Sequence, residues 1–252
     1  MTRRRWIADE VSGNRAALVG SHADHLARVL RGRIGQEFDI STGENVRRGR
    51  ITNIAEGRIE FDLGEIIPTS ATPTLTLLLS IFKFDRMEWA IEKCSELGAA
   101  RIVPVIAQRT EVHLAAAAPK RVERWQHLAR QASEQARRAQ PPEISPPARL
   151  KDAMTASGGV RIVLAESEHG LMLKDAIVKD MIVKDAIPRA ALQSPVPASE
   201  ITLAFGPEGG WTQTEFNLFL QAGWIAASLG STILRAETAA IAATAVALAA
   251  MS

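Results

Sequence analysis

The stretch Leu229-Gly-Ser-Thr-Ile-Leu-Arg-Ala-Glu-Thr238, followed by an almost unbroken run of Ala, Ile, Val and Leu to residue 250, decides the fold. No ionisable side chain occurs from Thr238 to Ser252. A helix that is apolar on every side predicts burial on every side. The run is shorter than the roughly 20 residues that span a bilayer, so we expect it in the core of a globular domain. Just before it, Arg235 and Glu237 would present charges beside unpaired backbone N–H groups, an arrangement suited to a ligand.

A second turn of the same kind lies upstream, in Ile201-Thr-Leu-Ala-Phe-Gly-Pro-Glu-Gly-Gly-Trp-Thr212. Its first five residues read as a buried strand, which the Gly-Pro pair ends. The Gly-Gly pair lets the backbone approach a ligand closely, and Thr212 with Glu215 has the spacing of a capping box. Either turn alone is typical of an ordinary strand-to-helix connection. Two of them, separated by one helix and one strand, favour a ligand site at the carboxyl ends of strands in an α/β sheet.

The chain changes character near residue 70. Residues 37–40, 49–52 and 58–62 read as short strands separated by turn signals, which predicts a small barrel. The Pro-containing segment 68–73 is the best linker, and the continuous apolar run at 75–82 is typical of a strand in a parallel sheet. We therefore predict a β domain at 1–70 and an α/β domain at 71–252.

Three helices and one irregular repeat complete the predicted elements. Helices are expected at 21–30, with Ser21 as N-cap, at 85–97 and at 119–138. Three copies of a Lys-Asp pair recur every five residues at 174–185. A five-residue step advances about 500° around a helix, so the repeat encodes no single helical face. It predicts a partly helical insertion, to which we assign no function.

Composition bounds the class of protein. The chain has 252 residues, of which 46% are apolar and 23% charged, and this balance is typical of a globular protein. The net charge is only +2, so a nucleic-acid surface would have to come from local clusters such as Arg47–Arg50, and such a charge run is more often a solvated edge. A single cysteine, Cys94, excludes an internal disulfide and a Cys-based zinc site, and suits a reducing cytoplasm. The scattered histidines predict no metal site, and the amino terminus lacks the apolar segment of a signal peptide.

The two glycine-bearing turns, Phe205–Gly210 and Leu229–Thr238, resemble the signature loops of the SPOUT, or α/β-knot, RNA methyltransferases. Further motifs agree in their order along essentially the whole chain: His25–Arg31, Lys83–Trp89, Glu92–Gly98, Glu134-Gln135 and Pro142–Ile144. Together they are most similar to the ribosomal RNA small subunit methyltransferase E family. That family methylates N3 of one uridine, uridine 1498, in 16S rRNA of the small ribosomal subunit.

The resemblance implies an α/β fold: a C-terminal α/β-knot domain with a parallel sheet and a trefoil knot, and a PUA-like RNA-binding barrel at the N-terminus. It further implies S-adenosylmethionine as cofactor, homodimers formed through the knot helices, a cytoplasmic location, and neither membrane nor metal. The cofactor-binding residues that it implies are Phe205, Gly206, Pro207, Glu208, Gly209, Leu229, Gly230, Ser231, Ile233, Leu234, Arg235 and Thr238. The RNA-binding residues are Arg3, Arg4, Arg5, Arg31, Lys83, Arg86 and Arg138.

The expected chemistry needs alignment more than covalent help. A sulfonium is already a good leaving group, so the protein has to align the methyl group with the acceptor. A cation beside the uracil oxygens would stabilise the anion that develops as N3 loses its proton, and Arg235 or Arg138 could supply it. Glu237 is the carboxylate nearest in sequence to the tail turn, Leu229–Thr238. It could act as a general base, or it could be only a partner of the helix dipole.

Two alternatives stay open from the sequence. The chain could act on another RNA, such as tRNA or 23S rRNA. It could also be a non-catalytic RNA-binding module, because Ala236 and Ser231 stand where the family usually carries Thr and a basic residue. A dinucleotide site of the Gly-x-Gly-x-x-Gly type is not indicated, because no such motif follows an early strand.

Overall fold

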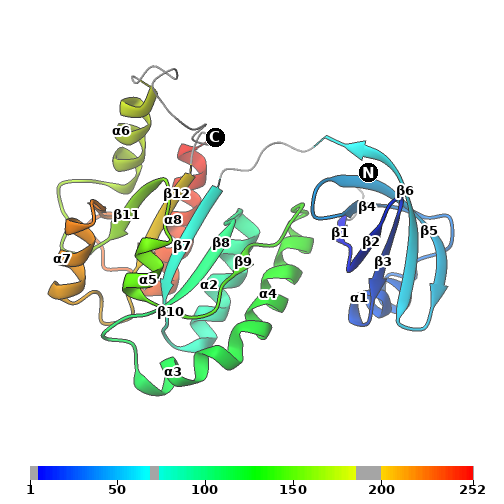
Figure 1. Cartoon of the computed structure of the whole chain (residues 1–252), viewed down its shortest axis with the longest axis horizontal. Helices are drawn as coiled ribbons and strands as arrows, with labels where there is room; N and C mark the ends of the chain where they lie inside the picture. Colours follow the sequence, from blue (N-terminus) through cyan, green and yellow to red (C-terminus); the bar gives the residue numbers. More distant parts are fainter. Residues whose placement is uncertain (1–4, 69–73, 186–199, 252) are drawn as a thin grey trace. The chain divides into compact units, whose positions relative to one another are not determined.

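The structure is a computed structural model that describes residues 5–68, 74–185 and 200–251. The chain divides into two compact units (Figure 1). The first comprises Met1–Ala71 with Arg130–Pro141, and the second Thr72–Ala129 with Pro142–Ser252. The end of the long helix predicted at 119–138 therefore belongs to the first unit. The expected linker falls, from residue 69 on, outside the described residues. No helix of the described part is long and apolar enough to cross a membrane.

The first unit is built on a six-stranded sheet of order β1-β4-β5-β6-β3-β2. Its neighbours are antiparallel except for the parallel pair β1–β4. Within the described residues β1 and β2 stand at opposite ends of this path, so the sheet is open and the predicted closed barrel is not confirmed. The strands are β1 (Arg5–Ile7), β2 (Glu10–Ser12), β3 (Arg15–Val19), β4 (Glu37–Ser41), β5 (Val46–Ala55) and β6 (Arg58–Ile67).

A short helical segment covers the core of this sheet. It consists of α1 (Ser21–Asp24) and a π-helical turn (His25–Val29), and it buries Leu26 against the strands. The prediction that Ser21 is the N-cap is wrong. Gly20 holds that position at φ 57°, a left-handed conformation that favours glycine, and no side chain caps the helix. The segment ends before Arg31, which has φ 51°.

The second unit is an α/β domain with a parallel sheet, as the sequence predicts. The strand order is β10-β8-β7-β12-β11-β13, with β9 beside β8, and every pair is parallel. Buried apolar residues fill β7, β8 and β12, because a sheet covered on both faces exposes neither. The strands are β7 (Thr74–Ser80), β8 (Arg101–Ile106), β9 (Glu143–Ile144), β10 (Ala148–Arg149), β11 (Val160–Leu164), β12 (Glu200–Phe205) and β13 (Ile225–Ala227).

Helices pack on both faces of this sheet. One apolar cluster joins the sheet to α2, the first turns of α4, α6 and α8, and a second joins it to α5 and α7. A short helix, α3, and a 3₁₀ turn at Ala118–Arg121 lead into α4. The helices are α2 (Phe84–Leu97), α3 (Val112–Ala117), α4 (Val122–Gln135), α5 (Leu150–Thr155), α6 (Leu173–Asp185), α7 (Gln213–Gln221) and α8 (Ala236–Ala250).

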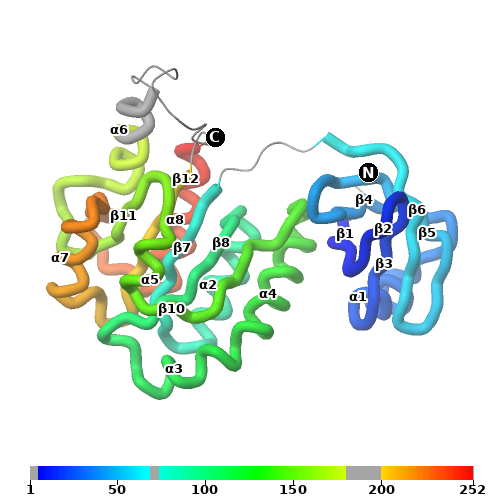
Figure 2. The backbone as a smooth tube through the Cα atoms, in the orientation of Figure 1, coloured from blue at the N-terminus to red at the C-terminus, as the bar shows by residue number. Residues whose placement is uncertain are grey.

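The apolar tail forms α8, which packs beside α2, α6, β7 and β12 although it follows them all in sequence (Figure 2). Thr244 and Leu248 fix it against α2: the Thr244 Oγ1 lies 3.4 Å from the Cys94 Sγ, and Leu248 fills the space beside Gly98. The expectation of burial on every side is wrong for a single chain, because Ala245 and Ala249 are exposed. The exposed side of α8 is lined by small residues.

The Lys-Asp repeat lies in α6. This helix buries Leu173, Ala176 and Ile177, and it packs on α8 and β11. Its first half is therefore amphipathic in spite of the five-residue step. Side chains from Asp180 on, and residues 186–199, lie outside the described part of the chain.

Candidate functional site

A cavity of about 590 Å³ lies where β11, β12 and β13 end. Because these neighbouring strands are parallel, the loops that follow them meet at one edge of the sheet. The cavity is lined by residues 164–167 after β11, by the glycine turn (residues 206–212) after β12, and by the tail loop (residues 228–235) after β13. Its volume is typical of sites for small molecules, which measure about 300–1,000 Å³. The two turns that the sequence singled out therefore form one site.

The glycine turn folds tightly on itself. The N–H of Gly210 donates to the Pro207 carbonyl at 2.7 Å, with Gly210 at φ 67°. A Cβ on Gly206 would lie 3.2 Å from the backbone of Gly210, which cannot give way as a flexible side chain can. Thr212 and Glu215 form the predicted capping box at the start of α7. Gly206 therefore has no room for a side chain, and Gly210 adopts a backbone conformation that favours glycine.

The tail loop brings the amino end of α8 to the cavity. Gly230 has φ 125°, which glycine alone adopts readily, and Arg235 is the residue that precedes the helix. Arg235 and Ile233 are exposed and line the cavity, as do the first-turn residues Ala236 and Ala239. The positive end of a helix dipole thus faces this space.

One arginine connects the charges of the two loops. The Arg86 Nη1 lies 2.8 Å from the Glu208 Oε1, and its Nε lies 3.8 Å from the Glu237 Oε1. Glu237 is 3% exposed, and its second carboxylate oxygen has no hydrogen-bond partner among the described residues. Glu237 therefore lies buried behind Arg86, whereas Arg86 and Glu208 line the cavity.

The structure brings most of the expected cofactor residues together. Those that line the cavity are Phe205, Gly206, Pro207, Glu208, Gly209, Leu229, Gly230, Ile233, Leu234 and Arg235, with Arg86 from the RNA set. Ser231, Thr238, Glu237 and Lys83 are not among the lining residues. Arg5, Arg31 and Arg138 belong to the first unit, and Arg3 and Arg4 lie outside the described residues.

Sequence reasoning missed several lining residues, namely Arg109, Glu166, Ser167, Trp211 and Phe216. Arg109 follows β8, and Glu166 and Ser167 follow β11. The rule that loops after parallel strands converge at one edge could have marked these loops as candidates, but not which of them reach the cavity. Among the described residues no group of three or more His, Cys, Asp or Glu could hold a metal ion.

Two of the clustered arginines of the first unit are engaged within that unit. Arg48 forms an ion pair with Asp39 at 2.6 Å, and Arg47 donates to the carbonyls of Leu63 and Gly64, each at 2.9 Å. Arg138, expected near the catalytic cleft, is largely buried, and this burial lowers the pKa of its guanidinium to about 10. The contacts of Arg47 and Arg48 reduce the basic surface that the sequence suggested at Arg47–Arg50.

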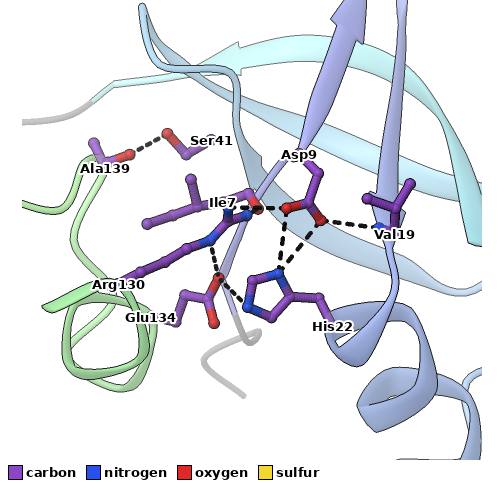
Figure 3. Close-up of polar contacts among 8 residues, drawn as sticks. All are labelled: Ile7, Asp9, Val19, His22, Ser41, Arg130, Glu134 and Ala139. Atoms are coloured by element: carbon purple, nitrogen blue, oxygen red, sulfur yellow. Dashed lines mark hydrogen bonds and ion pairs between the residues drawn. The ribbon is translucent and has the colours of Figure 1, made fainter. Parts of the chain in front are cut away.

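A polar cluster joins the six-stranded sheet to residues 130–141 within the first unit (Figure 3). Asp9 lies at its centre: its carboxylate contacts the His22 ring at 3.3 Å and Arg130 at 2.8 Å, and accepts from the Val19 N–H at 2.9 Å. Burial alone would raise the pKa of Asp9, but these hydrogen bonds and the Arg130 charge outweigh it and lower the pKa. Asp9 thus carries its charge as part of the structure of this unit.

A parallel α/β sheet with a ligand-sized cavity between two glycine-bearing loops is typical of proteins that bind a small molecule at the carboxyl ends of the strands. Comparison with known proteins narrows the class. The model of the RNA methyltransferase domain family matches residues 69–248. The chain belongs to this family and, within it, to the ribosomal RNA small subunit methyltransferase E family.

Relatives and solved structures support that membership. The ribosomal RNA small subunit methyltransferase E of Synechocystis is 31% identical over 88% of this chain and 69% of its own length. That of Bacillus subtilis is 30% identical over 88% and 85%. The structure of the Neisseria gonorrhoeae enzyme bound to S-adenosylmethionine has a TM-score of 0.76 at 28% identity, and covers 96% of this chain and 95% of its own. A putative methyltransferase from Legionella pneumophila, also with S-adenosylmethionine, has a TM-score of 0.78 at 26% identity, over 99% and 98%.

Proposed function

We propose that this protein transfers a methyl group from S-adenosylmethionine to N3 of a uridine in 16S rRNA of the small ribosomal subunit, at position 1498. The observation that carries the proposal is the cavity between the glycine turn and the tail loop, in a chain of the methyltransferase E family. Its size fits a nucleoside ligand, and its wall offers both apolar side chains and close backbone. A residue-by-residue role for the cavity follows from that fit.

The lining of the cavity suits the flat base of such a cofactor. Phe205, Leu229 and Leu234 supply apolar surface for a flat base, and the backbone at Gly206 and Gly230 lets amide groups approach it. We also assign to cofactor binding Pro207, Gly209 and Ile233, which line the cavity, and Ser231 and Thr238, which do not line it. S-adenosylmethionine, when bound, supplies an electrophilic methyl group on a sulfonium.

Arg235 is the residue that we assign to the reacting base. It is exposed at the cavity beside the amino end of α8, so its guanidinium can stabilise the anion that forms as N3 of uracil loses its proton. Arg138 is retained as a second candidate for this task. Glu237 is buried and faces Arg86, which supports a role in positioning Arg86 over a role as general base.

The first unit, with the domain at 1–70, is assigned to RNA binding as a PUA-like module. Exposed Arg31 supports this assignment, because it supplies a cation for phosphate contact. Arg3, Arg4 and Arg5 from the same unit, and Lys83 and Arg86 from the α/β domain at 71–252, are the other residues that we assign to RNA binding.

Homodimers formed through the knot helices are part of the proposal. The exposed side of α8 carries Ala245 and Ala249, and small residues allow a second helix to approach closely. The trefoil knot is supported by the path of the chain, which leaves β13 at the sheet edge and returns in α8 to β7 and β12. The buried thiol of Cys94 suits the cytoplasmic location that this function implies.

Methyl incorporation into ribosomal subunits tests the proposed substrate. The protein is incubated with labelled S-adenosylmethionine and small subunits that lack the modification, and the labelled nucleotide is mapped. Label at N3 of uridine 1498 is the expected result. Label in tRNA or 23S rRNA instead would assign the cavity to another RNA. Absence of label in every RNA, with the cofactor bound, would refute the enzymatic assignment.

A further inference from the structure

We propose that Arg109 and Glu215 are positioning residues that hold the glycine turn in the shape that binds the cofactor. Both lie outside the two loops that the sequence motifs mark. The inference rests on the proposed function of the cavity, and it adds a part of the molecule, the β8 loop (residues 107–110), to that site. It concerns how the site is held, not which atoms react.

Arg109 reaches the glycine turn from the β8 loop. Its guanidinium donates to the Gly209 carbonyl and lies 3.5 Å from the Trp211 carbonyl, and the side chain itself lines the cavity. Its Cδ would be 3.3 Å from a Cβ placed on Gly209, so the aliphatic part of Arg109 also packs on the turn. One side chain therefore fixes two carbonyl orientations in a turn where glycine permits many.

Glu215, in the first turn of α7, makes a second connection between the glycine turn and the β8 loop. The side chain is 2% exposed, and its Oε1 accepts from the Gln108 N–H at 2.7 Å. Its Oε2 accepts from the Thr212 N–H at 2.9 Å. A buried carboxylate that satisfies two backbone donors from segments over 100 residues apart in sequence is a strong tie, because losing it leaves those donors unpaired.

The β8 loop is itself anchored to the sheet. The hydroxyl of Thr110 accepts from the Ala107 N–H at 3.1 Å and donates to the Ile81 carbonyl at 3.3 Å, and Thr110 is buried. In the sheet order β8 is separated from β12 by β7, so these contacts reach across one strand to the glycine turn. On its other side, the turn is held by the ion pair of Arg86 with Glu208. The turn is thus tied to an anchored loop at Gly209 by Arg109 and at Thr212 through Glu215.

The consequence for binding is preorganisation. A turn rich in glycine loses more conformational entropy on ordering than other segments, and a ligand that has to order it binds less tightly. With the β8 loop contacts in place, this conformational entropy is lost when the protein folds and not when the cofactor binds. Removal of the contacts should therefore weaken cofactor affinity while the chemical step at saturating cofactor stays almost unchanged.

Calorimetric titration with S-adenosylmethionine tests the proposal on the full chain. For Arg109→Ala we expect Kd to rise about tenfold. This is the lower end of the effect expected when hydrogen bonds from a charged group are lost, because Arg109 is exposed. Arg109→Lys keeps one donor and should recover part of that loss. In Glu215→Gln, the single amide oxygen can serve only one of the two backbone donors, so Kd should also rise. KM for the cofactor should follow Kd, with kcat within about twofold of the parent.

Arg101→Ala is the matched control. Arg101 lies at the start of β8, at the opposite end of the strand from Arg109, and its Nε donates to the Ser145 hydroxyl at 3.2 Å. It should leave cofactor Kd unchanged. Amide hydrogen exchange at Gly210 and Trp211 should accelerate in Arg109→Ala and stay at the parent rate in Arg101→Ala. Melting temperatures without cofactor show whether each variant is folded.

The outcomes separate this inference from the proposed function. If the parent protein binds no S-adenosylmethionine, the assignment of the cavity fails. If the parent binds it and folded Arg109→Ala and Glu215→Gln bind it equally well, the positioning role is overturned. A fall in kcat at unchanged KM in these variants would likewise overturn it, since it would assign Arg109 to the reaction itself. Should Glu215→Gln fail to fold, the exposed Arg109 and its lysine variant decide the result.

Discussion

Arg86 and Glu208 form an ion pair at 2.8 Å between side chains that are 122 positions apart in sequence. The pair ties the first turn of α2 to the glycine turn at the cavity. Both side chains are about one-third exposed, so solvent screens the attraction and the pair contributes modestly to overall stability. The pair has a larger effect on the shape of the cavity than on overall stability, because Arg86 also faces buried Glu237.

Arg86 and Lys83 should therefore differ when each is replaced by alanine. Arg86→Ala releases Glu208 and leaves Glu237 buried without its cation, so we expect the Kd for S-adenosylmethionine to rise several-fold. Lys83 is exposed and does not line the cavity, so Lys83→Ala should affect only RNA affinity. Calorimetry with cofactor and filter binding with RNA measure the two effects. Equal cofactor Kd in both variants would contradict this division.

Gly206 and Gly209 should respond differently to alanine. A Cβ on Gly206 meets the Gly210 backbone, whereas one on Gly209 meets the flexible side chain of Arg109. Overpacking against backbone costs about 1–3 kcal/mol, so Gly206→Ala should weaken cofactor binding about tenfold or more. Gly209→Ala should weaken cofactor binding less than Gly206→Ala, because the Arg109 side chain can shift. Titration of both variants with S-adenosylmethionine checks the contrast, and a larger loss at Gly209 would be inconsistent with the geometry.

Arg235→Ala should reduce turnover while the fold and the cofactor site remain. Arg235 is exposed at the cavity, so its loss removes a cation from the reacting base without opening the core. Loss of one group that stabilises a developing anion lowers kcat by about 10²–10³-fold. Single-turnover methylation measures the rate, and cofactor calorimetry shows that the site is intact. Near-normal turnover would remove Arg235 from the mechanism.

Cys94 should be inert to thiol reagents in the folded protein. Burial raises the pKa of its thiol from 9.0 to about 12, with Thr244 partly opposing this. Because the folded pKa is the higher one, the stabilisation is complete below about pH 9 and is lost as pH rises toward 12. By pH 10.5 the loss amounts to about 2 kcal/mol. Urea unfolding at pH 8 and pH 10.5 measures it, and the sequence contains no tyrosine to add to the titration.

Cys94→Ala is the control for that measurement. This variant lacks the thiol, so the part of the pH dependence that belongs to Cys94 should disappear. Rapid labelling of the native parent protein at pH 8, or an identical pH dependence in Cys94→Ala, would show that the thiol is accessible or does not titrate with unfolding.

Local features of the site could be predicted from the sequence. The capping box of Thr212 and Glu215 and the two glycine turns depend on residues a few positions apart, and the structure shows them where the spacing places them. The parallel sheet followed from continuous apolar strands such as β7. Contacts that depend on strand order could not be predicted. Arg109 meets Gly209, 100 residues away, only because β8, β7 and β12 lie in that order and register.

The errors have separate physical causes. β2 has only three residues, all exposed, so no alternation marked it as a strand. Ser21 matched the N-cap pattern, but the left-handed turn at Gly20 starts the helix one residue earlier. The composition of α8 indicated burial on every side, but a single chain leaves Ala245 and Ala249 exposed, because α2, α6 and the sheet cover only the rest of the helix.

The crystal structure of the protein with S-adenosylmethionine is the most direct test of the central claim. We predict cofactor density between residues 206–210 and residues 229–234, with the methyl group exposed toward Arg235. Cofactor bound elsewhere on the chain, or a cavity that stays empty at saturating cofactor, would contradict it.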